Sequence, residues 1–294
     1  MKSSIILIGN PAAKGFSLKK IEQACLFLES KDRKVEKVFT TRKGEATALA
    51  GAAAEKSPPL IIAAGGDGTI NEIVNGVAGS EVPVAILPLG TTNVLARELD
   101  IPGDVEGAMT AAIERTPRVI SLGKIEAVRP QSFSPRHFVL MAGIGYDGET
   151  VFGINENLKK ISGKGAYIFS GIKTLFSFDP EELLFTIGGK TYPGYSAIIG
   201  NASKYGGNFR VTPDAKLTEP SLDVCIFKGR RSMDILRYVL GIAAKSHLRF
   251  RDVEYVKTHG IEIKGKAHIQ LDGDYFGMTP ARIFSVPDAL RLVF

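Results

Sequence analysis

The chain has 294 residues, of which 44% are hydrophobic and 23% charged, and its formal net charge is +6. This composition is that of a globular protein and is far from that of a disordered chain. The basic residues are scattered, and aromatic residues do not alternate with them in a stripe, which argues against a nucleic-acid partner. A net positive charge suits other anions, such as nucleotide phosphates or an anionic membrane.

The two cysteines, Cys25 and Cys225, each lie in an apolar stretch, which is typical of buried, inert thiols. They show no metal-ligand spacing, and a reducing compartment fits them. The N-terminus lacks the features of a signal peptide. The most apolar segment, Gly165 to Phe178, is too short to span a bilayer. We therefore expect a cytoplasmic protein, with peripheral membrane association left open.

Strand and helix signals alternate up to about Val119. Apolar runs bounded by turn residues predict strands, and apolar residues at helical spacing predict helices. The predicted strands are Ile5–Ile8, Val35–Phe39, Leu60–Ala64 and Val84–Leu87. A first helix is predicted after Ser17, its N-cap, and three more are predicted at Glu45–Lys56, Ile70–Val77 and Thr92–Leu99. This alternation predicts a parallel sheet covered by helices on both faces.

After Val119 the chain becomes rich in strand signals. Gly188-Gly189 predicts a hairpin turn. Only two helices are predicted, at Ala166–Phe176 and Met233–Ala244. We predict an antiparallel β-sandwich. Its strands are expected at Lys124–Val128, His137–Ala142, Leu183–Ile187, Ser196–Ile199, Leu222–Phe227, Ile261–Ile263, Ala267–Leu271 and Arg282–Val286. The fold class is therefore α/β plus all-β, with domains over 1–123 and 124–287.

The segment Ala64–Glu72 follows a buried strand and opens a helix. Its glycines, Gly65, Gly66 and Gly68, let the backbone turn sharply and approach a ligand. The start of the helix offers unpaired N–H groups and the positive end of the helix dipole. Such a loop, at the carboxyl end of a parallel strand, favours a phosphate site over a plain turn.

Three polar residues in this segment, Thr69, Glu72 and Asp67, have candidate roles. Thr69 and Glu72 have the spacing of a capping box, which would fix the start of the helix. The carboxylate of Asp67 is costly beside phosphate unless it binds a metal or takes a proton. A helix-capping aspartate in a structural turn is the alternative for Asp67.

Two further loops repeat the design, Gly9-Asn10-Pro11 after the first strand and Pro88–Asn93 after the fourth. Three such loops at one edge of a sheet predict convergence on one nucleotide. The pattern is neither the Rossmann glycine fingerprint nor a Walker-type loop, so ordinary dinucleotide or P-loop binding is disfavoured.

These segments together resemble the diacylglycerol kinase catalytic family, which includes bacterial lipid kinases, sphingosine kinases and ceramide kinases. The likeness runs along almost the whole chain in the expected order. It is carried by Gly65-Gly66-Asp67-Gly68-Thr69, Asn71-Glu72-Ile73-Val74-Asn75-Gly76, Pro88-Leu89-Gly90-Thr91-Thr92-Asn93, Ala96-Arg97, Ala142–Asp147, Pro213–Leu217 and Leu271–Asp274. The Gly-Gly-Asp-Gly-Thr element alone is shared with NAD kinases and phosphofructokinase-like enzymes.

The resemblance implies a nucleotide-binding α/β domain and a β-sandwich domain for the lipid, with the site in the cleft between them. The last strand, about 288–294, often returns to the first domain in this family. The resemblance also implies that ATP, with Mg2+, contacts a set of residues in the first domain. These are Asn10, Pro11, Thr41, Gly65, Gly66, Asp67, Gly68, Thr69, Asn71, Glu72, Gly90, Thr91, Thr92 and Asn93.

Three acids are candidates for catalysis, namely Asp67, Asp272 and Asp274. By similarity, Asp272 and Asp274 face the cleft, and the second acid, usually Glu in the family, is the proton acceptor. Asp67 would hold part of the Mg2+ that bridges the phosphates, or act as the base itself; sequence leaves these roles open. A hairpin turn is the alternative for Asp272-Gly273-Asp274, since Asp-Gly is a strong turn signal.

A structural Mg2+ site of the bacterial members maps onto Lys216 and Ser221, through carbonyls, and onto the carboxylate of Glu219. A plain turn is the alternative, although oxygen ligands are of the hard type that Mg2+ prefers. Ser121 stands where bacterial diacylglycerol kinases often have Asp, and this departure puts diacylglycerol specificity and one metal contact in doubt.

A lipid substrate requires an apolar groove beside the nucleotide pocket. Candidate residues lie in Tyr167-Ile168-Phe169 and in Leu175–Phe178, with a core helix as the alternative. We therefore expect an ATP-dependent kinase that transfers the γ-phosphate to a hydroxyl of diacylglycerol, a sphingoid base or a related lipid at a membrane surface. The alternatives are an NAD kinase and a catalytically silent nucleotide- or lipid-binding regulator. Whether the protein is a homodimer stays open.

Overall fold

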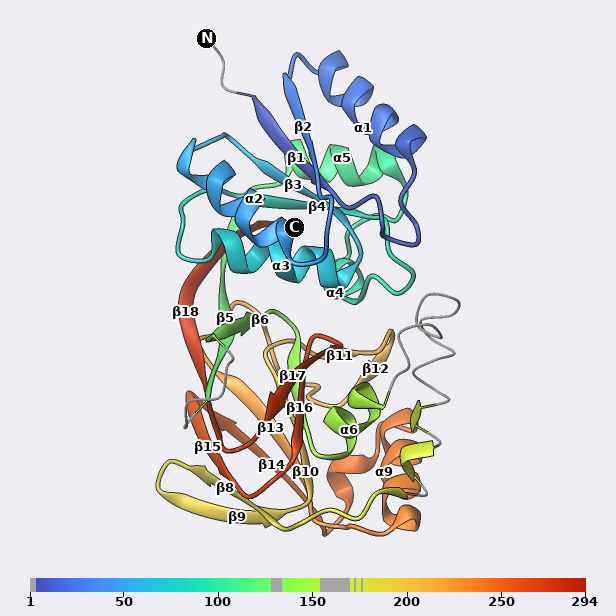
Figure 1. Ribbon diagram of the computed structural model, residues 1–294, viewed down its shortest axis with the longest axis vertical. Helices are drawn as coiled ribbons and strands as arrows, with labels where there is room; N and C mark the ends of the chain where they lie inside the picture. The colour runs from blue at the N-terminus through green and yellow to red at the C-terminus, as the bar shows by residue number, and fades with distance from the viewer. Residues whose placement is uncertain (1–3, 128–133, 154–169, 172, 176) are drawn as a thin grey trace. The chain divides into compact units, whose positions relative to one another are not determined.

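The computed structural model describes residues 4–127, 134–153, 170–171, 173–175 and 177–294. The chain divides into two compact units (Figure 1). Unit 1 comprises Met1–Leu122 and Pro287–Phe294, and unit 2 comprises Gly123–Val286. Two strands, β5 (Pro117–Ala127) and β18 (Ala281–Val293), contribute residues to both units.

Unit 1 is built on a parallel sheet with the strand order β2-β1-β3-β4-β18. The inner strands are buried along their whole length, as a sheet covered on both faces requires. The end of β18 joins this sheet, where Leu292 pairs in parallel with Val84. The other strands are β1 (Ile5–Gly9), β2 (Val35–Phe39), β3 (Ile61–Gly65) and β4 (Val84–Pro88).

Helices cover both faces of this sheet (Figure 1). On one face α1 (Leu18–Ser30) packs with α5 (Val105–Glu114), and on the other α2 (Glu45–Glu55) packs with α3 (Asp67–Val77). The buried residues of α2 are all alanines, so α3 approaches it closely. A Cβ on Gly76 would lie only 2.3 Å from the carbonyl oxygen of Thr47. This close packing brings side chains of α3 to the start of α2.

Unit 2 contains two antiparallel sheets. The first has the order β14-β13-β10-β7-β16-β17, and the second β18-β15-β8-β9 with β5 and β6 beside it. Their strands are β6 (Arg136–Phe138), β7 (Met141–Ile144), β8 (Leu183–Ile187), β9 (Lys190–Gly194), β10 (Ser196–Gly200), β13 (Leu222–Phe227), β14 (Val253–Thr258), β15 (Gly260–Lys264), β16 (His268–Leu271) and β17 (Asp274–Met278). A short pair, β11 (Lys204–Tyr205) and β12 (Phe209–Arg210), stands apart.

The core of unit 2 is formed by apolar side chains from both sheets. Phe185 of β8 and Ile263 of β15 pack in one cluster with Val224 of β13 and Leu271 of β16. Helical segments of unit 2 include α6 (Tyr146–Phe152), α9 (Ser232–Ala243) and the 3-10 turn η1 (His247–Arg249), and residues 170–171, 173–175 and 177 are helical as well. Among the described residues, no helix is both long enough and apolar enough to cross a membrane.

The structure confirms the predicted fold class, a parallel α/β unit followed by an antiparallel β unit. Gly188-Gly189 forms the predicted turn between β8 and β9, with positive φ at both residues. Both cysteines are buried, and burial raises the pKa of each thiol. The predicted strand His137–Ala142 is instead split into β6 and β7. The helix α5 was not predicted, although Asp104 is a typical N-cap residue and its side chain accepts from the Gly107 amide.

Candidate functional site

The candidate site of unit 1 lies at the carboxyl ends of β1 and β3. The sheet order places β2 and β3 on opposite sides of β1. The connection from β1 to β2 therefore runs in one direction along the sheet, and the connection from β2 to β3 runs back in the other. Open α/β sheets bind ligands at such a switch point, outside the carboxyl ends of the strands. The loops that follow β1, β3 and β4 are the three glycine-containing loops of the sequence.

Hydrogen bonds bring the first two of these loops together. The backbone N–H of Asn10 donates to the carbonyl of Ala64 over 3.3 Å. The Asn10 side-chain amide Nδ2 donates to the Thr69 hydroxyl over 3.1 Å, and its Oδ1 accepts from the amide of Ala12 at 2.9 Å. Asn10 therefore joins the end of β1 to the first turn of α3.

The third loop lies against the second. The amide of Leu89 donates to the carbonyl of Gly65 over 2.8 Å. The two loops approach so closely that a Cβ on Gly90 would lie 2.5 Å from the Cα of Gly66, closer than atoms can come. Asn93 holds the loop in shape, because its Oδ1 accepts from the Gly90 amide at 2.8 Å and its Nδ2 donates to the Gly90 carbonyl at 3.0 Å.

Two carboxylates of α3 bind the starts of neighbouring helices. Glu72 accepts from the amides of Gly44 (3.1 Å) and Ala46 (3.3 Å) at the start of α2. Asp67 accepts from the amide of Leu95 (3.1 Å) in the first turn of α4 (Val94–Glu98). The capping box expected from Thr69 and Glu72 does not form, because α3 begins earlier, at Asp67, and Glu72 faces α2.

The start of α3 itself has no side-chain cap; its N-cap is Gly66. A start without a side-chain cap leaves backbone N–H groups and the positive end of the dipole available for an anion. Burial raises the pKa of Asp67, although backbone amides of Val94, Leu95 and Asn93 act in the opposite direction. The site thus combines an anion-binding helix start with one poorly hydrated carboxylate.

The remaining predicted nucleotide contacts lie around these loops. Thr41 is exposed, and its amide and hydroxyl both donate to the carboxylate of Glu45. Asn71 is buried in α3, where its side chain accepts from Asn75 at 3.2 Å. Pro11, Gly68, Thr91 and Thr92 lie within the same three loops or the first turn of α3. Whether these residues contact ATP stays a prediction.

In unit 2, Asp272-Gly273 forms the two-residue turn of the β16–β17 hairpin, with positive φ at both residues. The Asp272 carboxylate accepts from three successive backbone amides, those of Val139 (2.8 Å), Leu140 (2.9 Å) and Met141 (2.9 Å). Asp274 lies beside the guanidinium of Arg136 at 3.5 Å and keeps 24% of its side chain exposed. Two acids of one hairpin therefore have different surroundings.

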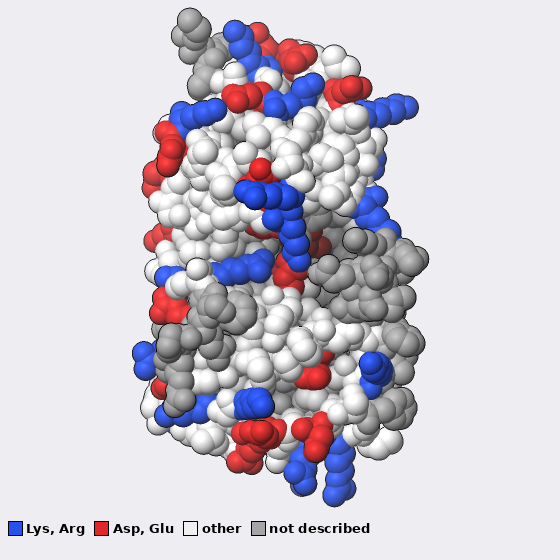
Figure 2. Space-filling model, viewed as in Figure 1, with Lys and Arg blue, Asp and Glu red and all other residues white. Residues whose placement is uncertain are grey.

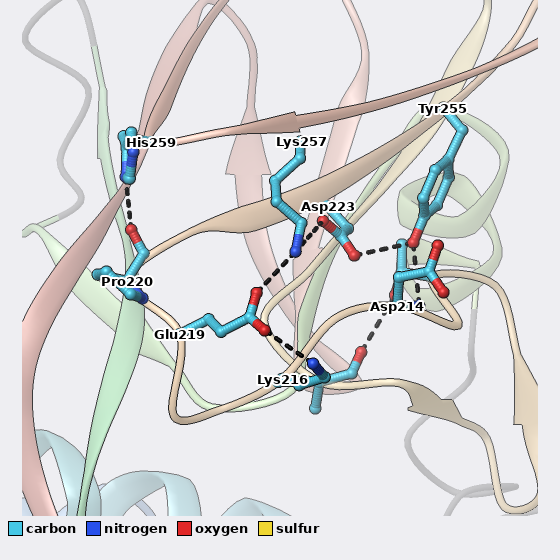
Figure 3. A network of polar contacts seen from close by, with 10 residues as sticks. Asp214, Lys216, Glu219, Pro220, Asp223, Tyr255, Lys257 and His259 are labelled. Atoms are coloured by element: carbon cyan, nitrogen blue, oxygen red, sulfur yellow. Dashed lines mark hydrogen bonds and ion pairs between the residues drawn. The ribbon is translucent and has the colours of Figure 1, made fainter.

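The predicted structural metal residues surround an ion-pair network in unit 2 (Figure 3). The Glu219 carboxylate lies between two ammonium groups, those of Lys257 (2.7 Å) and Lys216 (2.9 Å). Hydrogen bonds from Lys257 and Lys216 lower the pKa of Glu219 to about 2. The buried carboxylate of Asp223 accepts from the Tyr255 hydroxyl at 2.9 Å and lies 3.9 Å from Lys257.

These residues do not fit a divalent cation as they lie. The only carboxylate of the predicted set already binds two cations, and Mg2+ requires oxygen ligands that are free to coordinate it. Among the described residues, no cluster of three or more His, Cys, Asp or Glu side chains is suited to a metal ion. The metal role of Lys216, Glu219 and Ser221 stays a prediction.

Some residues of the candidate sites have no signal in the sequence, and some predicted residues lie outside the part of the chain that the structure describes. Lys257 and Tyr255 join the Glu219 network from β14, far along the chain, and Asp223 joins it from the start of β13; no local motif marks them. Ser121 is buried in β5. The groove candidates Tyr167-Ile168-Phe169 and Phe176 lie outside the described residues, as do most of the helix predicted at Ala166–Phe176 and Val128 of the strand predicted at Lys124–Val128.

Two family models match the chain. The diacylglycerol kinase catalytic domain matches residues 4–125, and the YegS C-terminal NAD kinase beta sandwich-like domain matches residues 141–294, just over half of the chain. The chain therefore belongs to the family defined by the YegS-type C-terminal β-sandwich-like domain, and its first part matches the diacylglycerol kinase catalytic domain.

Curated relatives match along the whole length. The diacylglycerol kinase of Bacillus subtilis (strain 168) is 29% identical over 300 residues, covering 100% of this chain and 96% of the relative. The diacylglycerol kinase of Staphylococcus aureus (strain JH9) is 28% identical over 294 residues, covering 97% and 90%. These relatives make this chain a kinase-family protein and favour a lipid kinase-like function.

Solved structures agree in fold. A Bacillus anthracis str. Sterne protein described as a candidate diacylglycerol kinase has a TM-score of 0.81 at 24% identity, over 100% of this chain and 96% of its own. Yeast NADH kinase, solved with NADH, has a TM-score of 0.52 at 11% identity over 100% and 84%. At such identities the likeness concerns the fold alone.

Proposed function

We propose that this protein transfers the γ-phosphate of ATP to a hydroxyl group of a lipid. One observation carries the proposal more than any other. At the switch point of the unit 1 sheet, α3 has no side-chain cap at its start, while its own carboxylates, Asp67 and Glu72, cap the two neighbouring helices. Phosphate is the ligand for which such a helix start is best suited.

The three loops supply the parts that phosphoryl transfer needs. Transfer depends on positioning and on neutralising charge rather than on covalent chemistry of the protein. Backbone amides of the first turn of α3 bind the phosphates, and Gly66 and Gly90 keep side-chain atoms out of the space between the loops. Asn10 and Asn93 fix the backbone of the loops, so the amides are oriented before the nucleotide arrives.

Mg2+ would be held by the phosphates, water and the carboxylate of Asp67, which suits a hard cation and lies next to the start of α3. When bound, the ion neutralises charge on the transferred phosphate. Because a cation nearby favours the ionised carboxylate, it would oppose the effect of burial on the Asp67 pKa.

Asp274 is the better candidate for the group that takes the proton from the lipid hydroxyl. The carboxylate of Asp272 is already bound by three backbone amides, so it is not free to accept a proton from a substrate. Asp274 is partly exposed, and it forms an ion pair with Arg136 at 3.5 Å. A positioned base contributes on the order of 10²–10⁴-fold to the rate.

The lipid acceptor is favoured over NAD by the names of the relatives. The two curated relatives described above match this chain over at least nine-tenths of their own length and are diacylglycerol kinases, whereas the yeast NADH kinase shares 11% of residues. Diacylglycerol, sphingoid bases and related lipids all present the hydroxyl that the reaction requires. Such substrates lie in a membrane, so the proposal includes peripheral association with a membrane surface.

Phosphorylation of a total lipid extract by the purified protein with ATP and Mg2+, read by mass spectrometry, tests the proposal. We expect a lipid phosphate product that is lost or reduced at least 100-fold in Asp67→Asn. Asp104→Asn is the matched control, because Asp104 caps α5 (to Gly107, 2.7 Å) away from the three loops. A product only from NAD, or ATP binding without product on any lipid, would contradict it.

A further inference from the structure

The helix α9 in unit 2 is apolar on two opposite sides. Its inner side, with Ile235 and Tyr238, is buried, and the Tyr238 ring lies 4.8 Å from that of Phe227. The outer side exposes large apolar side chains at helical spacing, namely Met233 (72%), Leu236 (38%), Val239 (50%) and Leu240 (60%). We call these four residues the outer face of α9. A contiguous exposed apolar face of this kind marks an interaction surface.

Positive charge is concentrated around this helix. Residues 228–254 contain seven Lys or Arg and three Asp or Glu, a net charge of +4 out of +6 for the whole chain. The acids are engaged, since Glu254 pairs with Lys228 (2.7 Å) and Asp252 with Arg237. Five exposed cations have no ion-pair partner in the described part of the chain. They precede or follow α9 in sequence and are Arg230, Arg231, Lys245, Arg249 and Arg251.

The outer face of α9 and its flanking cations point to one occupant: we propose that they dock the protein on the surface of an anionic lipid bilayer. An interfacial helix has an apolar side that enters the boundary between headgroups and acyl chains, and basic residues that attract anionic lipids. The proposal deepens the function proposed above, because it says how a kinase reaches a lipid substrate, and it rests on that function for its biological purpose.

A second copy of the chain is a poorer occupant. A symmetric dimer through this face would bring two segments of charge +4 together, and like charges across an interface oppose association. An anionic bilayer complements the same charges. Each cation close to such a surface raises the affinity about fivefold, and the effect falls off within a Debye length.

Co-sedimentation with vesicles, in the absence of ATP, tests the proposal. We expect the intact protein to bind vesicles of phosphatidylglycerol and phosphatidylcholine, and to bind pure phosphatidylcholine at least tenfold more weakly. Met233→Glu with Leu240→Glu should lower the affinity for the anionic vesicles at least tenfold. Both side chains are largely exposed, so the double variant should fold, which circular dichroism checks. Leu26→Glu on α1, where Leu26 is 66% exposed, is the matched control and should bind normally.

A second variant separates charge from apolar contact. Arg230→Gln with Lys245→Gln and Arg249→Gln should reduce binding and flatten its dependence on salt. Unchanged vesicle binding in both sets of variants overturns the proposal. So does a change of solution mass from dimer to monomer in the double variant with vesicle binding intact, because the outer face would then join two copies.

The outcome is independent of the kinase proposal. If the wild-type protein phosphorylates no lipid, the proposed function fails, while vesicle binding still decides the role of α9. If it is a lipid kinase, Met233→Glu with Leu240→Glu should lose activity on lipid in vesicles but keep it on a short-chain lipid dissolved in water. Equal loss on both substrates contradicts a docking role.

Discussion

Asp272 and Asp274 show how two acids of one hairpin differ in their surroundings. The three amides that bind Asp272 belong to residues 139–141, more than 130 residues away in the sequence. A local pattern predicts the Asp-Gly turn but contains no information on such a partner. The sequence therefore predicted the turn correctly, while the difference between the two carboxylates required the structure.

This difference predicts opposite phenotypes. Asp272→Asn should lower the free energy of unfolding by about 3 kcal/mol, because buried amides lose a charged acceptor. Asp274→Asn should change it by less than about 1 kcal/mol, since a partly exposed ion pair of 3.5 Å contributes little. Urea unfolding measures both.

Activity completes the comparison. Asp274→Asn should reduce the phosphorylation rate about 100-fold or more, and Asp274→Glu, with the acid more usual in the family, should retain it. Full activity of Asp274→Asn would remove Asp274 as the base. A stable Asp272→Asn protein would show that its three hydrogen bonds are not needed by the fold.

Lys257 is the second residue whose role the structure reveals. Its ammonium binds Glu219 and is the cation nearest to Asp223 (Figure 3). We predict that, without nucleotide, EDTA leaves the melting temperature unchanged. Lys257→Met should lower it, and millimolar Mg2+ should restore part of the loss, because freed carboxylate oxygens then accept a divalent ion.

A matched exposed pair controls for the loss of a surface charge. Lys56→Met removes the partner of Glu36 in unit 1, at 3.5 Å, and should show no response to Mg2+. A wild-type protein that loses stability in EDTA, with the loss reproduced by Glu219→Gln, would instead place a metal at this network.

At the scale of elements, α3 organises the candidate site through its neighbours. Composition and spacing predicted the strand, the glycine loop and the helix, but the capping box was wrong. The pattern allowed Glu72 to cap its own helix, whereas close packing of α2 on α3 directs it to the amides of Gly44 and Ala46. The sequence alone permits Glu72 to cap either α3 or α2, and tertiary contacts determine that it caps α2.

The approach of the loops predicts the effect of one added methyl group. Gly90→Ala should raise the Kd for ATP at least tenfold, because its Cβ would lie 2.5 Å from the Cα of Gly66 and force the loops apart. Gly103→Ala, where a Cβ meets no atom within 4 Å, should bind ATP normally. Equal affinities of the two variants, measured by calorimetry, would exclude nucleotide binding between these loops.

At the scale of the whole molecule, hydrophobic periodicity was sufficient for the fold class. Apolar runs of four or five residues defined β1, β3 and β4, and Leu183–Ile187 and Leu222–Phe227 were predicted with the bounds that the structure gives. Sheet order, however, depends on pairings such as Leu292 with Val84, which join distant segments. Figure 2 shows Lys and Arg interspersed with Asp and Glu on the viewed face, as scattered charges in the sequence indicate.

The start of α3 as the phosphate-binding element is the central claim, and hydrogen–deuterium exchange of the intact chain tests it most directly. A non-hydrolysable ATP analogue with Mg2+ should slow exchange at residues 66–69 and in the loops after β1 and β4. Exchange should stay unchanged at the start of α5, where Asp104 already binds the Gly107 amide. Protection of other segments, with residues 66–69 unaffected by a saturating analogue, would contradict the account.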